Sequence, residues 1–230
     1  MFYWGDWTFL ILIPSMILSM YAQGKVTSTY QKFSSVRNRQ GLTGADVARI
    51  ILQRNGMGHI GVEHISGNLT DHYDPRAKVV RLSDAVYNQS SVAALGVAAH
   101  ETGHALQDHL GYGPLRMRHA IYPITAISSK ASMPIFMIGL FFGGSSGFLL
   151  QLGIILFSFS VIFQLVTLPV EFNASERALK ILEKEQLLTQ EEITPARKVL
   201  SAAALTYVAA AFASIMTLVR LLLIANRRND

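Results

Sequence analysis

Two histidines and a glutamate carry the clearest chemistry in the sequence: His100 and His104 are four residues apart, with Glu101 directly after the first. On a helix, positions i and i+4 lie one above the other, so both imidazoles can direct a ring nitrogen at one ion. Glu101 then lies on the flank of the same face. This is the H-E-x-x-H pattern of a zinc site, in which the carboxylate can take a proton from water at an open metal position.

The residues around this pattern favour a helix. Ser90-Ser91 offers an N-cap, the run from Val92 to Leu110 contains no proline, and Gly111 supplies a stop. The helix is rich in small residues that permit close packing, namely Ala93, Ala94, Gly96, Ala98, Ala99 and Gly103. A purely structural zinc site usually has four protein ligands, often cysteines, and the chain has no cysteine. We therefore expect a catalytic zinc ion rather than a structural one.

The composition indicates an integral membrane protein. Half of the 230 residues are hydrophobic and only 15% are charged. The apolar residues gather at 7–22, in two runs between about 131 and 169, and at 199–225, each near the length needed to cross hydrocarbon. The net charge of +5 is explained by membrane topology, because no basic segment interleaves with aromatic residues. We expect a lipid bilayer as partner and no nucleic acid.

The N-terminal segment, residues 1–22, is typical of a first membrane helix. Tyr3, Trp4 and Trp7 lie at one end and Tyr21 at the other, as interfacial aromatics do. A cleaved signal peptide is the alternative, although the segment lacks a basic start. Residues 25–130 and 171–199 hold 17 of the 20 lysines and arginines. The positive-inside rule therefore predicts that the zinc site faces the cytoplasm.

The segment before the zinc motif reads as a soluble α+β region. Thr43 can cap a helix that ends near Asn55-Gly56, and residues 78–82 form a short strand that stops at Ser83-Asp84. This strand has two interpretations. It is either an exposed edge that pairs with an extended peptide and aligns it past the metal, or an ordinary core strand.

After the zinc helix, the sequence predicts a membrane hairpin. The start of the first hairpin helix is open because of Lys130. Either this helix begins near Ala131, or it includes Lys130, whose side chain then snorkels to the interface or faces protein. Residues 143–147 form the tip, and 148–168 return. Glu171 then emerges on the side of the zinc helix, where it can complete a His-His-Glu ligand set. Glu176 is the competing third ligand. On a helix it points about 140° away from Glu171, so we do not expect both carboxylates to bind one ion.

The last helix is expected to start at Thr194-Pro195, with a cap and a proline at its first position, and to form the fourth span. The sequence thus divides into a first transmembrane helix (1–24), a catalytic domain (25–122), a transmembrane hairpin (123–170), a helical cytoplasmic segment with the third ligand (171–198), and a fourth transmembrane helix with a tail (199–230).

Four stretches in this order resemble the bacterial membrane-bound neutral zinc metallopeptidases of the YugP type and, more distantly, the HtpX-type membrane proteases. These stretches are residues 71–75, 79–85, 100–107 and 168–175. The resemblance implies an α-rich membrane protein with about four transmembrane helices and a small α+β, zincin-like HExxH domain. It also implies His100, His104 and Glu171 as zinc ligands and Glu101 as general base and acid.

The chain departs from the HtpX-like pattern at Ser175, since those proteins usually carry an aspartate four residues after the ligand glutamate. The resemblance therefore does not predict a carboxylate hydrogen bond to a ligand histidine. Four side chains are candidates for stabilising an oxyanion, and the sequence does not choose among them. They are Arg177, His72, Tyr73 and Tyr122.

The leading hypothesis is an endopeptidase that cleaves proteins at or near the membrane, with a protein or peptide substrate. A second is a membrane scaffold or partner subunit that retains a zinc site without turnover, and intact Glu101 argues against it. Zinc transport is a third, but the apolar runs offer no ligand beyond glutamine. A membrane protein partner or a second copy of the chain is compatible with each hypothesis.

Overall fold

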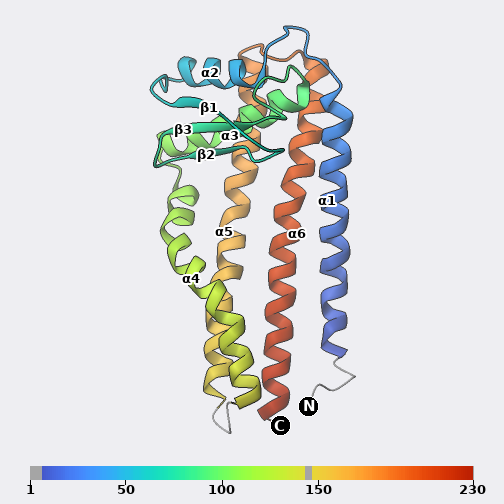
Figure 1. The fold of residues 1–230 in the computed structure, drawn as a ribbon, viewed down its shortest axis with the longest axis vertical. Coiled ribbons are helices and arrows are strands. Elements are labelled where there is room, and N and C mark those ends of the chain that lie inside the picture. Colours follow the sequence, from blue (N-terminus) through green and yellow to red (C-terminus); the bar gives the residue numbers. More distant parts are fainter. Residues whose placement is uncertain (1–6, 143–146, 230) are drawn as a thin grey trace. The chain divides into compact units, whose positions relative to one another are not determined.

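A computed structural model of the chain describes residues 7–142 and 147–229. Helices dominate, and the three strands found in these residues all precede the helix that carries the histidines (Figure 1). In chain order the elements are η1 (Trp7–Leu12), α1 (Ile13–Ser34), α2 (Gly44–Arg54), β1 (Gly61–Ile65), β2 (His72–Asp74), β3 (Val79–Ser83), α3 (Val92–His109), α4 (Gly113–Phe142), α5 (Phe148–Lys184) and α6 (Gln190–Asn229). The expected fold class, an α-rich membrane protein with a small α+β part, is confirmed.

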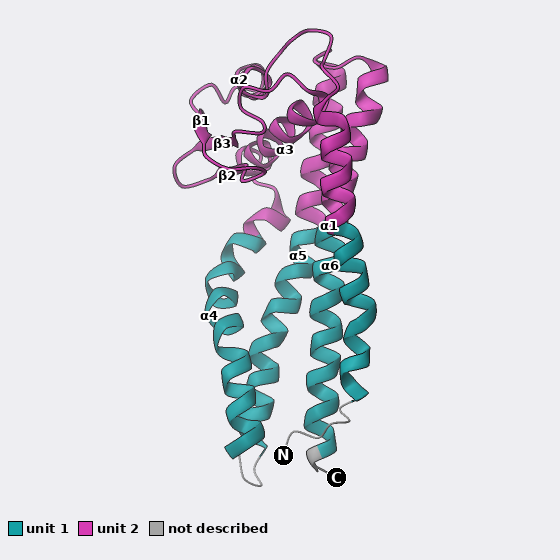
Figure 2. Ribbon diagram, turned by 45° about the vertical axis from the view of Figure 1, so that its right-hand side comes forward, with its two compact units in different colours: residues 1–22, 117–168, 206–230 teal, residues 23–116, 169–205 magenta. Residues whose placement is uncertain are grey.

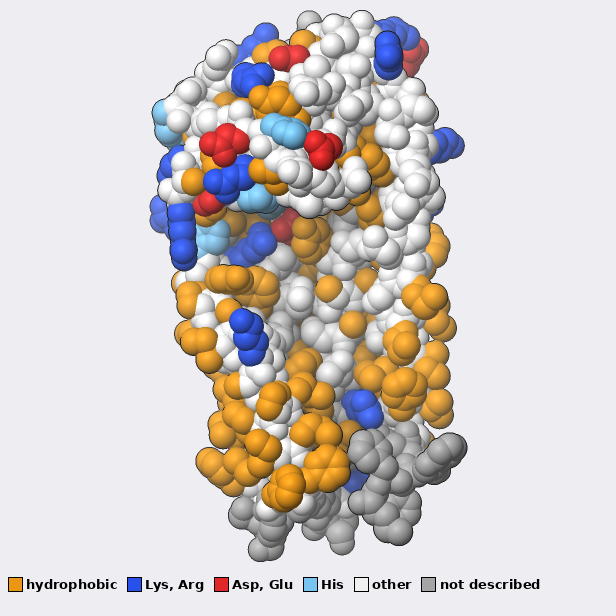
Figure 3. Space-filling view, viewed as in Figure 1, with side chains coloured by type: hydrophobic (Ala, Val, Ile, Leu, Met, Phe, Trp, Pro, Cys, Tyr) orange, Lys and Arg blue, Asp and Glu red, His pale blue; other side chains and the backbone are white. Residues whose placement is uncertain are grey.

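Among the described residues, four helical segments are long and apolar enough to cross a membrane: Trp7–Ser34, Gly113–Phe142, Phe148–Lys184 and Gln190–Arg227. Figure 3 shows hydrophobic side chains gathered on the exposed surface of these helices. Met20, Ile127 and Phe142 are among the large apolar side chains that are exposed. Such a surface is costly in water and suits hydrocarbon. The predicted interfacial aromatics Tyr3 and Trp4, and most of the predicted hairpin tip at 143–147, lie outside the described residues.

The structure decides the open question at Lys130. Helix α4 runs without a break from Gly113 to Phe142, although Pro123 and Pro134 lie inside it. Lys130 is therefore a helical residue, and its side chain is exposed. The alternative of a short helix that begins near Ala131 is wrong.

The expected start of the last helix is also wrong. Helix α6 begins at Gln190, five residues before Pro195. The backbone N–H of Thr189 donates to the Glu192 carboxylate, at 2.8 Å, as in one half of a capping box. Pro195 lies inside the helix, where it lacks the one N–H that would donate to the preceding turn. The threonine and glutamate, rather than the proline, mark the N-terminus.

The chain divides into two compact units, coloured separately in Figure 2. The first contains residues 1–22, 117–168 and 206–230, and it holds most of the apolar length of the long helices. The second contains residues 23–116 and 169–205, and includes the sheet, α2, α3 and the polar ends of α1, α5 and α6. All the residues of the H-E-x-x-H motif, together with Glu171, therefore belong to the second unit.

The sheet has the order β1-β3-β2. Strand β3 pairs in parallel with β1, in the register Gly61 with Val79, and antiparallel with β2, in the register Tyr73 with Val80. Both sides of β3 are thus paired. The interpretation of residues 78–82 as an exposed edge for a peptide is wrong, and the core-strand interpretation is confirmed, because Val80 and Leu82 are fully buried.

Local signals explain the two helices that pack against this sheet. Thr43 and Asp46 form a reciprocal capping box at the start of α2, and Asn55 follows its last turn. Ser91 caps α3 by accepting a hydrogen bond from the Ala94 N–H, at 3.1 Å. Gly111 follows the end of α3, as predicted, with a positive φ of +65°. The apolar faces of α2, β3 and α3 share one core with α5 and the start of α6.

Candidate metal centre

Helix α3 brings the two histidines of the motif together. His100 and His104 lie one turn apart, with ring centroids separated by 4.8 Å and ring planes at 83°. Both side chains are partly buried. Residues on the opposite face of α3, such as Leu95 and Ala99, belong to the core, which fixes the rotation of the helix about its axis. The imidazoles therefore face the same space.

Helix α5 delivers Glu171 to this space because α3 has a glycine at the point of contact. A Cβ atom at Gly103 would lie 2.7 Å from the carbonyl oxygen of Ala174, which is closer than real side chains come. Glycine therefore allows the backbones of α3 and α5 to approach next to His104. Glu171 lies almost one turn before Ala174 and is 2% exposed.

The three side chains converge. Oε2 of Glu171 lies 3.3 Å from Nε2 of His100 and 3.4 Å from Nε2 of His104. All three potential ligand atoms lie within 4.8 Å of one another. Two imidazole nitrogens and one carboxylate oxygen form a donor set that zinc favours in sites with an open position. The residues present thus fit a zinc ion.

Glu101 follows His100 directly on α3, is not one of the three clustered ligands, and is 9% exposed. Among the described residues, no donor makes a hydrogen bond or ion pair with its carboxylate. Its charge acts on His104 and on Asp71 across the site. A buried carboxylate that no protein group neutralises is available to accept a proton from a bound reactant.

The comparisons with known proteins agree with this geometry. Residues 8–226 match a protein family described as "Putative neutral zinc metallopeptidase". The chain belongs to this metallopeptidase family. It is also 49% identical, over 214 residues, to a protein of Bacillus subtilis (strain 168) named "Putative membrane protease YugP", and the match covers 93% of this chain and 94% of the relative. No solved structure matches the chain.

In this family member, each histidine is held through its second ring nitrogen. Nδ1 of His100 lies 3.1 Å from Oγ of Ser175, and Nδ1 of His104 lies 3.0 Å from Oε1 of Gln107. Because Nε2 faces Glu171 in both cases, Nδ1–H is the donor in each hydrogen bond. A neutral hydroxyl at Ser175 thus takes the place where the HtpX-like pattern has a carboxylate.

Gln107 is itself held by two hydrogen bonds, and no role was predicted for it from the sequence. Its Nε2 donates to the carbonyl of Val170, at 2.8 Å, and to Oδ1 of Asn173, at 3.0 Å. The amide therefore ties His104 to the turn of α5 that carries Glu171. The available sequence signal was its position three residues after His104, on the same helix face.

The charge balance of the cluster favours bound cations. Burial lowers the pKa of His104, but the carboxylates of Glu171 and Glu101 outweigh this, so that the net pKa is raised. The two carboxylates thus make a positive charge at this position more favourable than it is in water. Burial also raises the pKa of Asp71, against two hydrogen bonds from Ser83, and the charge of Glu101 raises it further. Asp71 belongs to the family-like stretch 71–75, but no function was predicted for it from the sequence.

The competing third ligand lies elsewhere. Glu176 is exposed and forms an ion pair with Lys180, one turn further along α5, at 2.5 Å. Its carboxylate does not belong to the cluster of His100, His104 and Glu171.

The four oxyanion candidates are placed as follows. The Tyr73 hydroxyl donates to Asp108 at 2.8 Å, and Arg177 donates to Oδ1 of Asn173 at 2.7 Å. His72 Nδ1 donates to the Thr70 carbonyl at 2.9 Å. Tyr122 belongs to the other unit, where its ring lies 6.1 Å from that of Phe163. The first three groups are thus already engaged by neighbouring residues.

Proposed function

We propose that the chain is a membrane-embedded zinc metalloendopeptidase that hydrolyses peptide bonds of membrane or membrane-proximal proteins. His100, His104 and Glu171 hold the zinc ion, and Glu101 is the general base and acid. The convergence of three ligand atoms within 4.8 Å, beside an unpaired carboxylate on the same helix, is the observation that carries this proposal.

The protein's own groups divide the chemistry between them. When bound, zinc acts as a Lewis acid and makes a water molecule a stronger acid. Glu101 accepts the proton released by this water on a carboxylate oxygen and later donates it to the nitrogen of the leaving amine. Ser175 and Gln107 hold the imidazoles in the tautomer that leaves Nε2 free to bind the metal.

The substrate strand is proposed to add to the sheet at β2. Within the described part of the chain, this strand pairs only with β3, and the hydrogen bond from Tyr73 to Asp108 anchors it beside α3. An extended peptide can form main-chain hydrogen bonds with such an edge, which aligns it largely independently of its sequence. This arrangement suits an endopeptidase better than an enzyme that binds a chain terminus.

The direct test compares the wild type with Glu101→Gln, both loaded with zinc, on a proteome-wide peptide mixture. The amide keeps the shape of the side chain but cannot accept the proton, so cleavage should fall about 10²- to 10⁴-fold or more while zinc is retained. A zinc-loaded wild type that cleaves no peptide would instead support the scaffold hypothesis. Equal cleavage by both proteins would place the chemistry elsewhere.

We also propose that the zinc site faces the cytoplasm, with the N-terminus outside. The clustering of 17 of the 20 lysines and arginines in residues 25–130 and 171–199 supports this orientation. Single cysteines at positions 34 and 145 of the cysteine-free chain test it with an impermeant thiol reagent on intact cells. Labelling at 145 but not at 34 is expected, and the reverse pattern would invert the topology.

A further inference from the structure

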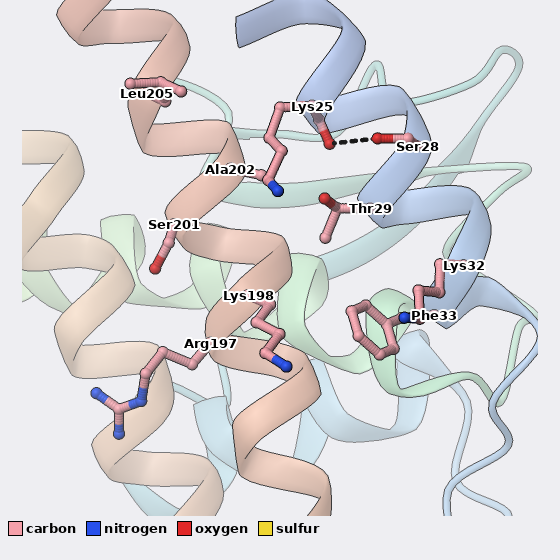
Figure 4. Close-up of a pocket in the computed structure, with 10 residues that line it drawn as sticks. All are labelled: Lys25, Ser28, Thr29, Lys32, Phe33, Arg197, Lys198, Ser201, Ala202 and Leu205. Atoms are coloured by element: carbon pink, nitrogen blue, oxygen red, sulfur yellow. Dashed lines mark hydrogen bonds between the residues drawn. The ribbon is translucent and has the colours of Figure 1, made fainter.

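A second polar site lies in the same unit as the metal cluster, between the polar ends of α1 and α6. It is a pocket of about 590 Å³. The lining residues are Lys25, Ser28, Thr29, Lys32, Phe33, Arg197, Lys198, Ser201, Ala202 and Leu205 (Figure 4). Four of these carry a positive charge and none is acidic. Such a pocket attracts an anion.

Helical spacing explains why the charges share one space. Lys25, Thr29 and Lys32 follow the i, i+4, i+7 rule and lie on one face of α1. Phe33 packs with Ala93 of α3 and Val199 of α6, which closes one end of the pocket and holds α1 beside α6. In Figure 4 the amines of Lys25 and Lys198 reach from opposite helices, whereas Arg197 points away from both.

Three lysines of the pocket and the Thr29 hydroxyl have no hydrogen-bond or ion-pair partner among the described residues, whereas Ser28 donates to the Lys25 carbonyl at 3.3 Å. In the part of the chain that the structure describes, no carboxylate forms an ion pair with Lys25, Lys32 or Lys198. The Lys32 ammonium lies 5.6 Å from the centroid of the Phe33 ring. Thr29 is only 9% exposed, and no hydrogen bond of its hydroxyl occurs among the described residues. Two or three cations and a buried hydroxyl donor are the groups that a phosphate needs.

The position along the chain identifies the source of the phosphate. Lys25 comes three residues after the apolar run 7–22 of α1, and Lys198 immediately precedes the apolar run 199–225 of α6. The pocket therefore lies at the two ends of apolar segments, where the headgroups of a bilayer lie. Ala202 and Leu205 extend its lining into the apolar run of α6, beside which an acyl chain can pack.

We propose that this pocket binds the phosphate group of an anionic phospholipid, with Lys25, Lys32 and Lys198 as the cations and Thr29 as a hydroxyl donor. The lipid is a structural ligand that neutralises the lysines between α1 and α6. This binding is independent of the zinc chemistry, because none of its residues contacts the metal cluster.

The test measures lipid binding to the purified full chain in neutral detergent by native mass spectrometry. The probes are phosphatidylglycerol, phosphatidylcholine and inorganic phosphate. The variant Lys32→Gln/Lys198→Gln removes two pocket cations. The matched control, Lys180→Gln/Lys184→Gln, removes two exposed lysines of α5 and changes the net charge equally. Size-exclusion chromatography checks that each variant is folded.

Phosphatidylglycerol should bind the wild type and the control alike and bind the pocket variant about 25-fold more weakly, from roughly fivefold for each of the two cations. Equal binding of phosphatidylcholine, or an equal loss in the control, would show a nonspecific effect and overturn the site. Unchanged binding in the pocket variant would do the same. Inorganic phosphate that binds while phosphatidylglycerol does not would assign the pocket to a soluble anion and overturn the lipid.

Discussion

The metal cluster and the basic pocket differ in how the protein holds their charges. In the cluster, a buried carboxylate lies between two imidazoles, and each imidazole is tied to a further side chain, Ser175 or Gln107. In the pocket, like charges from α1 and α6 face one another without a carboxylate. The first site is organised before its ligand arrives, whereas the second depends on an anion from outside. Substitutions should therefore affect the two sites separately.

Removal of the metal should give the largest effect and separate the sites most clearly. A zinc chelator is expected to abolish peptide cleavage, because the Lewis acid is lost, and added zinc should restore it. Magnesium should not restore it, since magnesium prefers oxygen ligands in octahedral geometry. Binding of phosphatidylglycerol should be unchanged in the chelated protein. A parallel loss of lipid binding would contradict the separation of the two sites.

Gln107→Ala tests whether the hydrogen bonds around the metal cluster contribute to zinc affinity. The substitution removes the hydrogen bond that fixes His104 and the link to Val170 and Asn173, so zinc affinity should fall about 10- to 100-fold. Competition with a chromophoric chelator measures this change. Arg49→Ala provides a control at an exposed ion pair of α2. An affinity equal to that of the wild type would mean that the ligands need no such support.

The pH dependence of zinc binding should show a smaller, graded effect. The pKa of His104 is raised above its usual value of about 6.5, because neighbouring carboxylates outweigh burial. The imidazolium therefore persists towards neutral pH, and zinc must displace its proton. Affinity should decrease as the pH falls, by up to about tenfold per unit for one displaced proton. Titrations at pH 6, 7 and 8 that give one constant affinity would contradict this coupling.

Local features were predictable from the sequence, and long-range partners were not. The caps at Thr43 and Ser91 lie within three residues of the groups that they bind, so the boundaries of α2 and α3 followed from spacing alone. The start of α6 was missed because Pro195 was weighted over the threonine and glutamate at 189 and 192. The position of β3 between β1 and β2 depends on pairing with separate segments, which the alternation of one strand does not encode.

The same division holds within the candidate site. The pair His100 and His104 is a local pattern. Helical angles indicate that Glu171 and Glu176 do not both bind one ion, but they do not choose between the two. The role of Gln107 could not be predicted, because its partners Val170 and Asn173 lie more than 60 residues away. At Ser175 the sequence suggested that a hydrogen bond was lost, because the HtpX-like pattern has a carboxylate at this position. In the structure the Ser175 hydroxyl nevertheless forms a hydrogen bond with His100.

The central claim is that one zinc ion is bound by His100, His104 and Glu171. The most direct measurement is the zinc content per chain, by plasma mass spectrometry, of purified wild type, Glu171→Ala and Glu176→Ala. The two variants remove the same group from the same helix, one from the cluster and one from an exposed ion pair. We expect one zinc ion per chain in the wild type and in Glu176→Ala, and a strong loss in Glu171→Ala. Full zinc in Glu171→Ala together with its loss in Glu176→Ala would contradict the account.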